Sequence, residues 1–163
     1  MLYTVNSRVL NRWTPRLGLV IVLLILFSFK LVSPAFADEP ARAQSELTAI
    51  TGLGTGRVIV SPTSQDQGTF AAEIAINIHN AQPNTAFSVR RAPDLVPNGI
   101  CTGTTYIPFG ETFTTSAGGA GATHFHFERG APFVSGVQFD VVFQVIGSDG
   151  SVLQSKCMTV TVK

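Results

Sequence analysis

The chain has 163 residues, of which 45% are hydrophobic and 13% are charged, and its formal net charge is +1. Four of its eleven basic residues lie in the first 37 positions, so the remaining 126 residues carry seven basic and ten acidic side chains, a net charge of −3. That balance excludes the clustered basic face by which proteins bind nucleic acids. We therefore expect no nucleic-acid partner.

Residues 1–37 have the pattern of a cleavable signal peptide. Three arginines precede the apolar run "LGLVIVLLILFSF", and Ala35 and Ala37 flank Phe36 in the A-x-A pattern of a cleavage site. The apolar run has 13 residues, shorter than the roughly 18 that a membrane-spanning helix needs. We therefore predict a secreted, extracellular or cell-surface protein. An uncleaved leader is the alternative, and it would be the only link to a membrane.

Residues 38–55 are polar and show no sustained hydrophobic period, which predicts a flexible N-terminal tether. From residue 56 onward the pattern changes to that of strands, so residues 56–163 are expected to form one domain. In "FAAEIAINIH", for example, every second residue from Ile74 to Ile78 is apolar and the residues between are polar or small. Turn sequences such as "NAQPN" and "GSDG" separate the strands.

Seven or eight short strands with regular turn signals predict an all-β fold, an immunoglobulin-like antiparallel β-sandwich. A jelly roll or a partly closed barrel is the alternative. The buried tryptophan of antibody domains is absent, because Trp13 is the only tryptophan and lies in the leader. The loops 92–104 and 129–136 are expected to be the binding edges, since loops on a rigid scaffold usually carry recognition.

Cys101 and Cys157 are the only cysteines. Two cysteines in an exported chain predict one disulfide bond. Because Cys157 alternates with Met158, Val160 and Val162, it falls on the face opposite the core, so the bond would fasten the long loop to the outside of the last strand.

The stretch "THFHFE" carries the candidate metal ligands. A strand period of two places His124, His126 and Glu128 on one face and the two phenylalanines on the other. Imidazole and carboxylate groups bind zinc, copper or iron, and His79 is the only other histidine that can complete the set. The same alternation is typical of a solvated antiparallel strand. The solvated face is the favoured interpretation, and a site for a divalent transition metal is the alternative.

The spacing of these histidines is similar to two families of β proteins. The cupins carry G-x5-H-x-H, matched here by Gly118, His124 and His126, but Gly130 and Ala131 stand where their glutamate belongs. The copper–zinc superoxide dismutases carry H-x-H-x-x-G, and here the glycine comes one residue later. Both resemblances cover a few residues and lack a ligand, so we infer neither activity.

Other features add two minor candidates. The loop residues Pro132, Phe133 and Val134 can form a small contact patch, but packing against the core is the favoured interpretation. Arg90 and Arg91 can hold an anion, but a solvated strand end, paired with Glu128, is the favoured interpretation. No nucleophile motif or phosphate-binding loop is present, so we expect no catalytic residues and no cofactor.

The sequence favours a secreted, non-catalytic binding module for an extracellular protein or surface ligand. A metal-binding protein or metalloenzyme is the alternative.

Overall fold

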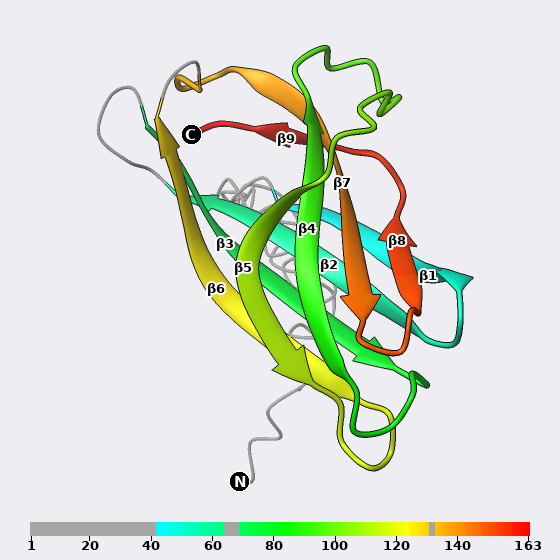
Figure 1. Cartoon of the computed structure of the whole chain (residues 1–163). Coiled ribbons are helices and arrows are strands. Elements are labelled where there is room, and N and C mark those ends of the chain that lie inside the picture. Colours follow the sequence, from blue (N-terminus) through cyan, green and yellow to red (C-terminus); the bar gives the residue numbers. More distant parts are fainter. Residues whose placement is uncertain (1–41, 64–68, 131–132) are drawn as a thin grey trace, which may run out of the picture. The chain divides into compact units, whose positions relative to one another are not determined.

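The computed structural model describes residues 42–63, 69–130 and 133–163, all within one compact unit that spans Asp38–Lys163 (Figure 1). The predicted leader, residues 1–37, lies outside the described residues. The described residues contain no helix, and therefore none long and apolar enough to cross a membrane. They form nine strands: β1 (Ala43–Thr51), β2 (Thr55–Thr63), β3 (Thr69–His79), β4 (Ala86–Asp94), β5 (Ile107–Thr114), β6 (Gly121–Gly130), β7 (Gln138–Gly147), β8 (Val152–Ser155) and β9 (Met158–Thr161).

All strand pairs are antiparallel and belong to one continuous sheet. Its order is β5-β4-β7-β8-β1-β2-β3-β6. β9 pairs with the first part of β7, at Gln138–Val141, and β8 pairs with the later part, at Gln144–Ile146. The sheet curls until its two end strands, β5 and β6, lie side by side and nearly close a barrel (Figure 1). The all-β prediction is confirmed, and the near closure agrees with the partly closed barrel that the sequence left as an alternative.

The core fills the inside of this curled sheet, because alternate residues of each strand point inward. Phenylalanines close the barrel where β5 and β6 meet. Phe109 on β5 has its ring centroid 5.0 Å from that of Phe125 and 5.2 Å from that of Phe127, both on β6. Phe109 also stacks on Phe143 of β7 across the interior. The seam between the end strands is thus held by edge-to-face aromatic contacts, which such rings favour.

The prediction of a flexible tether over 38–55 is wrong for Ala43–Thr51, which form β1 in the interior of the sheet. β1 pairs with β2 on one side and β8 on the other, and Leu47 lies opposite both Gly56 and Ser155. The Leu47 side chain is fully buried. It is the only buried residue of this strand, so the segment carries too little apolar pattern for the sequence to reveal it.

The long connection between β4 and β5 is folded against the outside of the barrel. Asp140 of β7 is fully buried there, and its Oδ2 accepts the backbone N–H groups of Asn98 and Gly99 at 2.9 and 2.6 Å. Its Oδ1 accepts the Thr159 hydroxyl of β9 at 2.6 Å. Burial opposes the ionisation of Asp140, but these hydrogen bonds together hold its pKa below the ordinary value. A buried carboxylate therefore fixes the connection to β7 and β9.

The disulfide predicted between Cys101 and Cys157 is present, with the two Cα atoms 5.4 Å apart. Cys157 lies between β8 and β9, which the sequence analysis took as one strand. The hydroxyl of Ser155 accepts the N–H of Phe143 and donates to the carbonyl of Lys156, where the pairing with β7 passes from β8 to β9. Together with β1, this division gives nine strands instead of the seven or eight expected.

Candidate functional site

The predicted histidine row lies on the outer face of β6, beside β3. Glu73 of β3 is the direct cross-strand neighbour of His126, and its carboxylate contacts both imidazoles. The distances are 2.8 Å to Nδ1 of His126 and 3.2 Å to Nε2 of His124. Glu128 contacts Nε2 of His126 at 3.1 Å. The structure thus brings together three of the predicted ligands, together with Glu73, which was not predicted.

Both ring nitrogens of His126 face carboxylates, an arrangement that favours the doubly protonated imidazolium. The hydrogen bond with Glu73 contributes most, and the bond with Glu128 next, to raising the pKa of His126 above its ordinary value. An imidazolium donates from both nitrogens and has no lone pair for a metal. The row is therefore arranged as a network of ion pairs on an open strand face.

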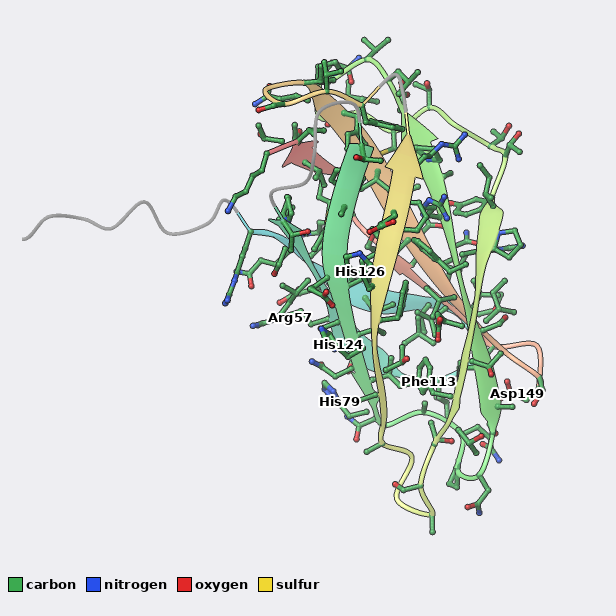
Figure 2. The ribbon with its side chains drawn as sticks, turned by 90° about the vertical axis from the view of Figure 1, so that its left-hand side faces the viewer. Arg57, His79, Phe113, His124, His126 and Asp149 are labelled. Atoms are coloured by element: carbon green, nitrogen blue, oxygen red, sulfur yellow. A yellow bond between two sulfur atoms is a disulfide. The ribbon has the colours of Figure 1, made fainter. Side chains whose placement is uncertain are left out.

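His79 does not complete a site with this row. It lies at the end of β3, opposite Thr55 of β2, whose hydroxyl is 3.0 Å from His79 Nε2. His124 instead pairs with Ala75, four residues earlier on β3, which places the backbones of the two histidines about 13 Å apart along the strand. Figure 2 shows the three histidines following one another along this face, with His79 furthest from His126. Among the described residues, no group of three His, Cys, Asp or Glu is arranged to hold a metal ion.

The ion-pair network makes a direct prediction. We expect the His126 imidazole to titrate above pH 6.5, and the Glu73→Gln variant to lower its pKa by removing the larger contribution. Because the pKa is raised in the folded state, this contribution to stability is complete below the ordinary histidine pKa and is lost as the pH rises through the raised value. Proton NMR of the imidazole resonances measures both effects.

Glu46→Gln is the matched control, because it removes the same charge from the exposed face of β1. It should leave the His126 titration unchanged. An equal shift in both variants would mean that net charge, and not the cross-strand contact, sets the pKa.

A second feature lies at the end of the barrel drawn at the top of Figure 1, beneath the connection between β4 and β5. A cavity of about 240 Å³ extends here from the core to the surface. It reaches buried side chains such as Ile74 and Phe143 at its inner end and the exposed Leu95 and Ile107 at its outer end. Both loops expected to be binding edges reach it, because Leu95 belongs to one and Phe133 to the other.

Of the residues predicted to form a contact patch, one is buried in the barrel and one is exposed to solvent. Phe133 is buried and lines the cavity, where its ring lies 4.9 Å from that of Phe139 and 5.8 Å from that of Phe70. Val134 is exposed, and Pro132 lies outside the described residues. Core packing, the favoured interpretation of this loop, therefore holds for Phe133.

Arg90 and Arg91, predicted at a strand end, lie in the middle of β4, which continues to Asp94, and their surroundings differ. Arg90 donates two hydrogen bonds to the side-chain carbonyl of Gln144, at 2.9 and 2.6 Å. The side chain of Arg91 points inward and is only 8% exposed, so the expectation of a solvated strand end paired with Glu128 is wrong for it. Its guanidinium carbon lies 4.2 Å from the ring centroids of both Phe109 and Phe127.

Arg91 and Arg129 line the cavity together. Burial, followed by repulsion from Arg129, lowers the pKa of Arg91 to about 10, so Arg91 stays charged at neutral pH. Among the residues that the structure describes, the ion pairs all involve His124 or His126, and neither of the two arginines has a carboxylate partner. Within the described ranges, two cations without a carboxylate partner therefore lie at an otherwise apolar cavity.

Fold and site together define a small, disulfide-bonded, nearly closed all-β barrel with an apolar cavity at one end. The sequence matches no protein-family model and no curated protein.

Proposed function

We propose that this chain is a secreted, non-catalytic binding module that takes a small apolar ligand into the cavity between loops 92–104 and 129–136. The observation that carries the proposal is the cavity itself, about 240 Å³ and lined almost wholly by apolar side chains. Ligand sites are usually concave and apolar with a few polar groups, and a cavity of about 150 Å³ already binds benzene in another protein.

The surroundings of the cavity support this function. Most of its lining residues belong to strands that are fixed in the sheet, so the site is largely preformed and binding need not order it. The connection between β4 and β5 at its mouth is held by the disulfide and by Asp140. Exposed apolar side chains at this end, Leu95, Val96, Ile100 and Val134, offer further contact area to an entering ligand. The disulfide is compatible with an oxidising, extracellular location.

Titration with phenylnaphthylamine, an uncharged apolar fluorophore, tests the proposal. We expect saturable fluorescence enhancement and a Val141→Phe variant that binds the fluorophore roughly 10-fold more weakly, because the larger side chain fills part of the cavity. Val142→Phe is the matched control. Val142 is the next residue of β7, is also buried, and lines a separate hollow beside Cys101 on the opposite face.

Both substitutions overpack the domain and should cost similar stability, about 1–3 kcal/mol. Equal effects on binding would contradict the cavity as the site. If Val141→Phe does not fold, the binding of a series of linear alcohols to the wild-type protein tests the same proposal. Their affinity should rise with the length of the alkyl chain until the cavity is full. An affinity independent of chain length, or no saturable binding, would overturn the proposed function.

A further inference from the structure

We propose that the ligand of this cavity is a single-chain anionic amphiphile, a medium-chain fatty acid, whose alkyl chain fills the apolar interior and whose carboxylate lies between Arg91 and Arg129. This inference rests on the proposed function, because it specifies the ligand class of the same cavity.

The two arginines continue the inward-facing apolar rows of their strands. Along β4, Phe87 and Val89 point into the barrel, and Arg91 has the same alternation. Along β6, Phe125 and Phe127 point inward, and Arg129 comes next in the same row. Each row thus changes from an apolar to a cationic residue at the same end of the barrel.

Arg91 lacks the neutralising partner that a buried charge ordinarily has. Within the described part of the chain, its guanidinium contacts the faces of Phe109 and Phe127 and has no hydrogen-bond acceptor. The two rings come from the two end strands, so they hold the guanidinium at the seam of the barrel. Arg129 is exposed at the end of β6 and adds a second positive charge. A carboxylate between them accepts hydrogen bonds from both guanidinium groups and removes their mutual repulsion.

The cavity residues other than the two arginines determine which chemical group can fill the interior. Of the described residues around the cavity, the two arginines are the only polar ones, and the others are aliphatic, aromatic or proline. Apart from the two arginines, the described lining side chains offer no hydrogen-bonding group to a sugar, nucleotide or peptide, so the inner part of the ligand is expected to be hydrocarbon. The volume of about 240 Å³ exceeds that of a benzene-sized cavity but lies below the roughly 300 Å³ at which drug-sized sites begin. The cavity therefore fits one short chain and not the two chains of a phospholipid.

The test compares octanoate, octanol and octylamine, which share the same alkyl chain and differ in head-group charge. Binding is measured by calorimetry or by displacement of the uncharged fluorophore. We expect octanoate to bind tighter than octanol by roughly 10-fold or more, and octylamine to bind most weakly, as charge-assisted hydrogen bonds predict. Arg91→Gln and Arg129→Gln should each reduce the preference for octanoate over octanol while octanol still binds.

Arg57→Gln is the matched control, since it removes the same charge from the exposed outer face of β2. It should leave the preference for octanoate intact. Arg129 is exposed, so its variant is expected to fold even if the Arg91 variant does not. If octanol binds as tightly as octanoate, or if the preference survives in Arg129→Gln, the amphiphile inference is overturned while the binding function stands. If no member of the series and no fluorophore binds, the proposed function itself fails.

Vesicles of neutral and anionic phospholipid complete the experiment. Binding to vesicles without binding to octanoate would overturn the inference, because it would assign the exposed apolar residues at this end to a membrane surface.

Discussion

Replacing Leu47 by alanine is expected to lower the free energy of unfolding by about 3 kcal/mol, within the range for truncating a fully buried leucine. Leu47 is fully buried in the interior strand β1, so the shorter side chain leaves a cavity between β2 and β8. Urea unfolding followed by circular dichroism measures the change.

Leu53→Ala is the matched control. Leu53 lies in the turn after β1 and is 65% exposed, so its replacement should change stability by no more than about 0.5 kcal/mol. Equal, small effects of both substitutions would mean that residues 43–51 do not pack as a strand.

Removing the disulfide is expected to cost about 4 kcal/mol of stability. Cys101 and Cys157 are 56 positions apart, and the loop-closure entropy that the bond removes from the unfolded chain corresponds to that value. A Cys101→Ser, Cys157→Ser double variant should therefore unfold at clearly lower urea concentration than the oxidised wild type. The melting temperature should fall by on the order of 10 °C.

The reduced wild-type chain provides the control for this double variant. It should match the variant in stability, because both lack the cross-link. Free thiols that titrate in the native, unreduced protein would contradict the bond itself. An unchanged stability would show that Asp140 and the rest of the connection hold the loop without it.

Strands with strict alternation were predictable because periodicity reports burial directly. The inward-facing isoleucines of β3 and the valines and phenylalanines of β7 are buried as the sequence indicates. β1 was missed because only one of its residues, Leu47, enters the core. Its place comes from pairing with β2 and β8, and single-sequence periodicity does not contain such long-range pairing.

The neighbours of the histidines likewise depend on long-range strand pairing, here the register between β3 and β6. Alternation places His124 and His126 on one face, but only the pairing of β3 with β6 shows that Glu73 lies between them and that His79 lies far along the strand. A shift of a few residues would have reversed that outcome.

The inward position of Arg91 could have been found from the sequence. The alternation that places Phe87 and Val89 in the core extends to Arg91, and the same reasoning leads from Phe125 and Phe127 to Arg129. The favoured interpretation of Arg90 and Arg91, a solvated strand end, followed from the usual behaviour of surface charges. An arginine at the next inward-facing position of a strand, after buried apolar residues, therefore indicates that its side chain points into the barrel.

The near closure of the barrel also bears on how the protein avoids self-association. The free backbone groups of an end strand can act as a template for a strand of another molecule. Here the two end strands, β5 and β6, lie against each other through Phe109, Phe125 and Phe127. β5 also contains Pro108, which has no N–H to offer. Each edge of the sheet thus shields the other, so the seam that borders the cavity also protects the domain against edge-to-edge aggregation.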